Sequence, residues 1–159
     1  MRYLMVYYSY EGNTELLAEN MADEIGADLL RLIPEKEMKS KGFMKFVWGG
    51  KQAVMGKKPP LKKLDKNPDD YDLIIIGTPV WAGRPAPPVK TFMVDNLPSE
   101  KKLAFFYTYE GGEGKTLELM DEMKKGGKVL GKTGFMAPLK GEKETIIRSA
   151  REWISSLNL

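Results

Sequence analysis

The sequence predicts an α/β fold of three layers: a doubly wound, five-stranded parallel sheet between two layers of helices. Strand-like apolar runs and amphipathic segments alternate five times along the 159 residues, which is the pattern of parallel strands joined by crossover helices. The strand-like runs are apolar at nearly every position, so both faces of the sheet should be covered. We expect a single domain over residues 1–159, because this length suffices for one buried core.

The N-terminal part of the chain is predicted to form a strand, a helix and a second strand. Arg2–Ser9 is apolar, aromatic or β-branched at nearly every position, as in a strand. Apolar residues then recur at helical spacing until Gly26, which favours a helix that ends there. A short strand follows at Asp28–Ile33 and is ended by Pro34. The apolar positions of the helix are Leu16, Leu17, Met21 and Ile25.

The C-terminal part continues the alternation. Tyr71–Gly77 contains the most apolar run of the chain and is predicted to be a central strand. The last helix has one apolar face, which should pack on the sheet. The further elements are a helix ending near Asn96, the strand Lys102–Thr108, the helix Thr116–Lys125, the strand Val129–Leu139 and the helix Glu142–Leu157. The apolar face of the last helix consists of Ile146, Ile147, Ala150, Trp153, Ile154 and Leu157.

The connection at residues 35–70 is longer than a compact α/β domain requires. It contains a helix-like stretch, Gly42–Met55. Residues 35–66 hold ten lysines and three acidic residues, whereas the whole chain has a formal charge of only +3. We interpret this basic connection as a solvated cover beside the sheet. The alternatives are a docking site for an acidic partner and a contact in a homodimer.

The composition excludes several kinds of chemistry. The chain has no cysteine and no histidine, so disulfides, thiolate catalysis, histidine-dependent triads and Cys- or His-ligated metals are absent. We expect no catalytic side chain and no metal site, and a cofactor or carboxylates should supply the chemistry. No apolar run reaches the ~20 residues of a membrane span, and no signal layout opens the chain. We therefore expect a cytoplasmic protein, and the small net charge indicates no nucleic-acid partner.

Three loops at the carboxyl edge of the predicted sheet are candidates for a ligand site. Residues 9–14 place hydroxyls, an amide and backbone N–H groups at a helix N-terminus, which suits an anion or is an ordinary N-cap. In residues 78–85, Trp81 is either a platform for a planar heteroaromatic ring or a core residue. The glycines of residues 108–115 allow close approach of a ligand, with Tyr109 as a second stacking face. A ligand-free surface loop is the alternative there.

These loops carry a resemblance to flavodoxins, the small FMN-binding electron carriers, over essentially the full length. Ser-Tyr-Glu-Gly-Asn-Thr stands where that family has Ser-x-Thr-Gly-Asn-Thr, and the two later loops match its flavin-ring loops. The resemblance implies the strand order 2-1-3-4-5, FMN as cofactor, and redox proteins as electron donor and acceptor. It implies FMN contacts from Ser9, Tyr10, Glu11, Gly12, Asn13, Thr14, Thr78, Pro79, Val80, Trp81, Ala82, Gly83, Thr108, Tyr109, Glu110, Gly111, Gly112 and Gly114.

The resemblance also implies roles for individual groups. A carbonyl in the Trp81–Gly83 turn would accept a hydrogen bond from N5 of the reduced flavin. Trp81 and Tyr109 would exclude water from the ring. Glu11 departs from the family pattern by placing a carboxylate in the phosphate loop, and we expect it to face solvent. Ser9, Asn13, Thr14 and backbone N–H groups would then bind the phosphate.

Other functions remain to be weighed against an electron carrier. The same fold hosts FMN-dependent NAD(P)H:quinone-type oxidoreductases, which is the main alternative. A flavin-free interaction module is a third class. The P-loop-like pattern at Gly126–Thr133 follows a predicted helix and runs through a predicted strand, so we reject it as a nucleotide site. The first strand ends in Tyr8 and Ser9 without an acidic cluster, which disfavours a phospho-acceptor domain.

Overall fold

Five parallel strands form the central sheet of the computed structural model, which describes residues 1–37 and 58–159. Along the sheet they are adjacent in the order β2-β1-β3-β5-β6, which confirms the predicted order 2-1-3-4-5. A two-residue strand, β4 (Arg84–Pro85), pairs antiparallel with the end of β3 and was not predicted. The parallel strands are β1 (Tyr3–Tyr7), β2 (Asp28–Arg31), β3 (Leu73–Trp81), β5 (Lys102–Tyr109) and β6 (Lys128–Met136).

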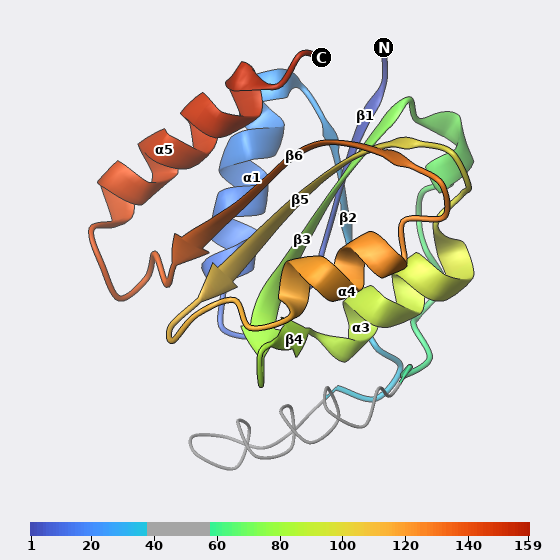
Figure 1. Cartoon of the computed structure of the whole chain (residues 1–159), viewed down its shortest axis with the longest axis horizontal. Coiled ribbons are helices and arrows are strands. Elements are labelled where there is room, and N and C mark those ends of the chain that lie inside the picture. The colour runs from blue at the N-terminus through green and yellow to red at the C-terminus, as the bar shows by residue number, and fades with distance from the viewer. Residues whose placement is uncertain (38–57) are drawn as a thin grey trace.

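Helices cover both faces of the sheet, as the three-layer prediction requires (Figure 1). Helices α1 (Asn13–Ile25) and α5 (Lys143–Ser156) lie on one face. The other face is covered by three elements: α3 (Pro87–Thr91), the π-helical turn Phe92–Asn96 that continues it, and α4 (Thr116–Glu122). A 3₁₀ turn, Pro68–Asp70, leads into β3.

The core consists of two apolar clusters separated by the sheet. Successive residues of β3 alternate between them: Ile74 packs toward α3 and α4, and Ile75 toward α1 and α5. Both side chains are fully buried, which explains why the strand is apolar throughout Leu73–Ile76. On α5, Ala150 and Ile154 are fully buried, and the other residues of the predicted apolar face pack against the same cluster at partial exposure.

The largest boundary difference is at the end of β3, which extends to Trp81 through Pro79. The last β1–β3 pair is Tyr7 with Gly77, so Pro79 interrupts no pairing with β1 although it lacks an N–H group. Pro79 instead pairs with Thr108 of β5. This extension brings the second predicted loop into the sheet and turns it into a hairpin.

The long basic connection leaves and re-enters the fold at one place. The N–H of Glu35 donates to the Pro60 carbonyl at 2.9 Å, and the N–H of Lys62 donates to the Ile33 carbonyl at 2.7 Å. The predicted helix Gly42–Met55 lies outside the described residues. In the two described stretches, no helix is long and apolar enough to cross a membrane.

Candidate functional site

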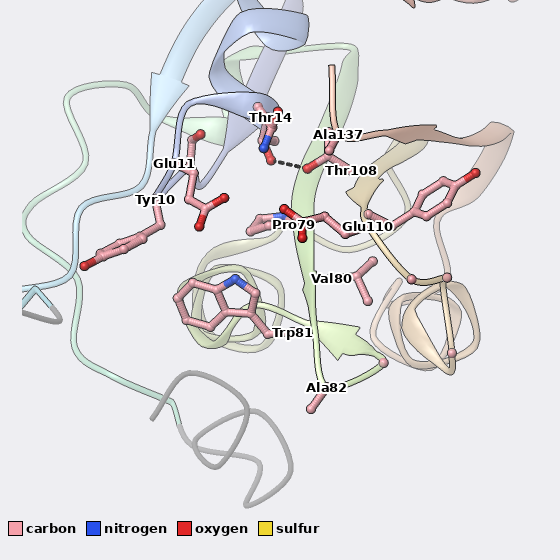
Figure 2. Close-up of a pocket in the computed structure, with 17 residues that line it drawn as sticks. Tyr10, Glu11, Thr14, Pro79, Val80, Trp81, Ala82, Thr108, Glu110 and Ala137 are labelled. Atoms are coloured by element: carbon pink, nitrogen blue, oxygen red, sulfur yellow. Dashed lines mark hydrogen bonds between the residues drawn. The ribbon is translucent and has the colours of Figure 1, made fainter. Parts of the chain in front are cut away.

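A cavity of about 540 Å³ opens at the carboxyl edge of β1, β3 and β5 (Figure 2). Small-molecule sites typically enclose about 300–1,000 Å³. The three predicted loops meet here, and all of their candidate residues line the cavity except Gly12 and Thr78. Ala137, which follows β6, lines it as well and was not predicted.

The first loop delivers backbone donors to one end of the cavity. Gly12 occupies the N-cap of α1 with a left-handed backbone (φ 104°) and has no side chain to cap the first turn. The first N–H groups of an α-helix have no partner within the helix, and the helix dipole adds partial positive charge there. The Oγ of Ser9 accepts the Gly12 N–H at 3.2 Å, which fixes the turn. This end of the cavity is suited to an anion.

Two buried threonines join the first and third loops at the same end. The hydroxyls of Thr14 and Thr108 lie 2.8 Å apart and share a hydrogen bond (Figure 2). Their exposed fractions are 1% and 4%. A hydroxyl has one proton and two lone pairs, so this bond leaves further hydrogen-bonding capacity for a ligand.

Gly12 and Thr78 shape the loops without lining the cavity. The Thr78 hydroxyl donates to the Pro79 carbonyl at 2.8 Å and accepts the Ala86 N–H at 2.9 Å. Thr78 is fully buried, so it ties the two strands of the β3–β4 hairpin together. The resemblance placed both residues in contact with FMN, and in this structure their position supports a role in loop geometry.

The second loop is a tight hairpin turn. Trp81 pairs with Arg84, and the two residues between them, Ala82 and Gly83, have φ values of 50° and 70°. Positive φ at both central positions is what a type I′ turn requires. The Gly83 carbonyl accepts the Lys115 N–H at 2.6 Å, so this carbonyl must break that bond before it can turn toward a ligand.

Close backbone contact joins the second loop to the third. Gly114 has φ 54°, and a Cβ at this position would lie 2.5 Å from the Cα of Gly83 and 2.7 Å from its carbonyl oxygen. Only a residue without a side chain allows this approach. The glycine predicted to permit close approach of a ligand therefore also permits close approach of a neighbouring loop.

Trp81 packs on the core and also lines the cavity, so it combines features of both alternatives, a core residue and a platform for a planar ring. The indole is half-buried, packs against the apolar cluster on the α3 and α4 side, and lines the cavity. Its ring meets Tyr8 and Tyr10 edge-on, with centroid distances of 5.6 and 6.2 Å. The Tyr8 hydroxyl donates to Glu37 at 2.8 Å. Burial, followed by this hydrogen bond, raises the pKa of Tyr8 above its usual value.

The third loop adds a second aromatic side chain to the lining. Tyr109 is half-buried, and its ring lies 5.6 Å from that of Tyr107 at an angle of 42°. Burial, followed by the charge of Glu113 and a hydrogen bond to it, raises the pKa of Tyr107. Stacking of Tyr109 on a flavin stays a prediction.

Charged side chains stand at the rim of the cavity. Glu11 is exposed, as expected, but it also lines the cavity, and Figure 2 shows it reaching from the first loop toward the space between Thr14 and Trp81. Glu110, in the third loop, also lines the cavity and accepts a hydrogen bond from Lys140 at 2.7 Å. The rim therefore combines two carboxylates with a lysine from the segment after β6.

That segment, residues 137–141, is the part of the site that sequence reasoning missed. The Ala137 N–H donates to the Tyr109 carbonyl at 2.8 Å, and the Leu139 N–H donates to Asn13 Oδ1 at 3.0 Å. The predicted strand Val129–Leu139 is too long at its C-terminal end, because β6 ends at Met136. Pro138, which stops the strand, was the available signal.

Flavoproteins and flavodoxins are among the solved structures with a similar fold. The flavoprotein of Lactobacillus acidophilus NCFM in complex with FMN is 27% identical, with a TM-score of 0.69 and coverage of 91% of this chain and 98% of that one. Oxidised flavodoxin 1 of Bacillus cereus is 17% identical, with a TM-score of 0.61 and coverage of 99% and 100%. A WrbA-like flavodoxin of Agrobacterium tumefaciens is 19% identical, with a TM-score of 0.64 and coverage of 98% and 94%. The last two show the fold alone.

A family comparison covers most of the chain, including the three loops. None of the curated proteins matches this chain. The family model described as Flavodoxin matches residues 2–129. These residues include β1 to β5 and all three loops that line the cavity. On this match, and on the fold that carries it, the chain belongs to the flavodoxin family.

Proposed function

We propose that this protein binds FMN in the cavity and carries electrons between redox proteins. One observation carries the proposal: an uncapped helix N-terminus and a half-buried tryptophan open onto the same cavity of about 540 Å³. The first feature suits a phosphate and the second a planar ring. FMN has both parts. When bound, it supplies the redox chemistry, and the protein positions it and tunes its environment.

The residues at the N-terminus of α1 fit the phosphate. Gly12 leaves the backbone N–H groups of the first turn uncapped, and Ser9 and Thr14 add buried hydroxyls. The Leu139 N–H uses only the Oδ1 of Asn13, so the side-chain NH₂ group is left to donate to a phosphate oxygen. Oriented N–H groups hold an anion through hydrogen bonds and through the helix dipole.

The hairpin and the third loop fit the flavin ring. Trp81 and Tyr109 line the cavity and offer aromatic faces that exclude water. Gly83 and Gly114 bring two backbones close together, so their peptide groups border the same space. A low-dielectric, dry surface around the ring disfavours added negative charge, which is how the protein would set the flavin potentials.

A carrier accounts for the cavity without a second substrate site. Every lining residue belongs to one of the three loops, except Ala137. In the part of the chain that the structure describes, one ligand, FMN, would therefore account for the cavity. A reductase of the same fold needs an additional surface that holds NAD(P)H or an acceptor against the flavin.

Two measurements test this function in sequence. Titration of the purified protein with FMN should quench flavin fluorescence at a 1:1 ratio and give the visible absorbance of a bound oxidised flavin. Anaerobic stopped-flow mixing of the FMN complex with NADH or NADPH should leave the flavin oxidised. Fast bleaching by either nucleotide without a partner reductase would assign the protein to the NAD(P)H-dependent oxidoreductases instead. Absence of any flavin complex would leave a flavin-free interaction module.

A further inference from the structure

A turn after β6 bridges two of the loops that line the cavity. Residues 137–140 form a turn in which the Lys140 N–H donates to the Ala137 carbonyl at 2.9 Å. Its N–H groups reach the third loop at Tyr109 and the first loop at Asn13. The Leu139 side chain lies over Gly12, because a Cβ on Gly12 would be 3.3 Å from its Cδ1. This turn therefore holds Lys140 at the rim of the cavity, close to the first helical turn of α1.

Two of the described residues that line the cavity, Glu11 and Glu110, are acidic, and negative charge opposes an anion site. Glu11 and Glu110 both line the cavity, and Glu11 belongs to the same loop as the uncapped N–H groups. A phosphate with roughly −1.5 to −2 charges at neutral pH is repelled by nearby carboxylates. An opposing cation at this rim weakens that repulsion and so favours a phosphorylated ligand.

Lys140 is placed to act as that cation. Its Nζ donates to Glu110 at 2.7 Å, and the side chains of the pair have exposed fractions of 63% and 45%. The hydrogen bond to Glu110 and the charge of Glu110 raise the pKa of Lys140, and the charge of Glu11 raises it further. The ammonium group therefore contacts Glu110 directly, and Glu11 acts on it only through its charge.

We propose that Lys140 offsets the charges of Glu11 and Glu110 at the rim, and thereby makes the site select the phosphorylated flavin FMN over riboflavin. The inference rests on the proposed function, because it assumes a flavin in this cavity. Lys140 is a positioning residue. It acts on the ligand by reducing the repulsion from the rim carboxylates and through the electrostatic attraction of its own charge. Through Ala137, which lines the cavity, this turn then borders the site beside the three loops.

A comparison of two ligands isolates this effect from the stability of the turn. FMN and riboflavin share the ring and differ in the phosphate, so a charge effect changes the Kd for FMN alone. At low ionic strength, Lys140→Gln should weaken FMN binding by roughly three- to tenfold and leave riboflavin binding unchanged. Added salt should shrink the difference. Flavin fluorescence quenching measures each Kd.

Three matched variants complete the test. Lys143→Gln removes an exposed lysine three residues along the chain and should leave both Kd values unchanged. Lys140→Arg keeps the charge and should retain the preference for FMN. Glu11→Gln should strengthen FMN binding. In the Glu11→Gln background, Lys140→Gln should weaken FMN binding less than it does in the wild-type chain, because the two charges interact.

The outcomes separate the two proposals. A wild-type chain that binds FMN, with Lys140→Gln weakening FMN and riboflavin equally, shows a structural role of the turn and overturns the inference alone. An unchanged Kd for FMN in Lys140→Gln also overturns it. A wild-type chain that binds neither flavin overturns the proposed function, and the inference with it.

Discussion

The end of the cavity at the N-terminus of α1 is lined by buried hydroxyls, whereas the end beside the β3–β4 hairpin is lined by half-buried aromatic rings. Thr14 and Thr108 are almost fully buried and hydrogen-bonded to each other. Trp81 and Tyr109 keep part of their surface open and meet other rings at 5.6 Å. We call these the hydroxyl end and the aromatic end.

Under the proposed function, this difference assigns each end to a different part of FMN. The hydroxyl end relies on directional groups fixed in advance by backbone bonds, which gives specificity for an anion. The aromatic end, beside the turn at Ala82 and Gly83, would contact the flavin ring, which FMN and riboflavin share. Changes at the hydroxyl end should therefore separate FMN from riboflavin, and changes at the aromatic end should not.

The largest effect is expected from Gly114→Ala at the aromatic end. The added Cβ would meet the backbone of Gly83 at 2.5 Å, so the second and third loops must move apart. We expect a loss of about 1–3 kcal/mol in the free energy of unfolding and weaker binding of both flavins by about 30-fold or more. Thermal unfolding and fluorescence titration measure the two effects.

Gly111→Ala is the matched control for this substitution. Gly111 also lines the cavity, but its Cβ would meet nothing within 4 Å and its φ is not in the left-handed region. The free energy of unfolding of the Gly111→Ala variant should stay within about 0.5 kcal/mol of the wild-type value. Equal behaviour of the two alanine variants would show that the contact between Gly83 and Gly114 does not hold the aromatic end together.

Trp81→Ala should follow with a smaller effect on flavin binding. The substitution removes a half-buried ring that contacts Tyr8 and Tyr10, so we expect a stability loss of about 1–3 kcal/mol. Both flavins should bind about tenfold more weakly. Trp81→Phe retains an aromatic face and should restore most of the affinity. A loss of FMN affinity without a loss of riboflavin affinity would contradict the assignment of Trp81 to the ring.

Thr14→Val tests the hydroxyl end. Removing one hydroxyl leaves that of Thr108 buried without its partner, which costs about 1–3 kcal/mol of stability. The double variant Thr14→Val/Thr108→Val should lose less than the sum of the single variants. We expect the Kd for FMN to rise about fivefold and that for riboflavin to stay constant. Equal weakening of both flavins would remove the distinction between the two ends.

Arg84→Ala should have the smallest effect. Arg84 pairs with Trp81 in the hairpin but does not line the cavity. Loss of its positive charge should lower the potential of the second one-electron reduction of bound FMN by roughly 10–40 mV, which corresponds to the ~0.2–1 kcal/mol of an exposed charge pair. An anaerobic redox titration measures the shift. An unchanged or raised potential would show that Arg84 does not act on the flavin.

The sequence predicted the strands because their pattern is local. Parallel strands covered on both faces are apolar throughout, and Ile74, Ile75 and Ile76 show this without any knowledge of their neighbours. The end of β3 was missed because it depends on pairing. Pro79 stays in the strand only since β1 has already ended and β5 continues beside it.

The site was predictable to the extent that motifs mark it. The three loops carry glycines, hydroxyls and aromatic residues at recognisable positions, and they converge on one cavity. The turn at residues 137–140 carries no such motif. Its place beside the cavity depends on contacts with Asn13 and Glu110, which are distant along the chain. The sequence alone does not show that Thr78 lies outside the cavity lining, because its hydroxyl is bound inside the hairpin through contacts that only the folded chain makes.

A paired titration tests the central claim most directly. Purified protein, freed of any bound flavin, is titrated with FMN and with riboflavin at low ionic strength, and fluorescence quenching and visible absorbance are followed. We predict a 1:1 complex with both flavins and a lower Kd for FMN, because the hydroxyl end adds the phosphate contacts. Equal Kd values would contradict the assignment of the hydroxyl end to the phosphate, and the absence of any complex would contradict flavin binding itself.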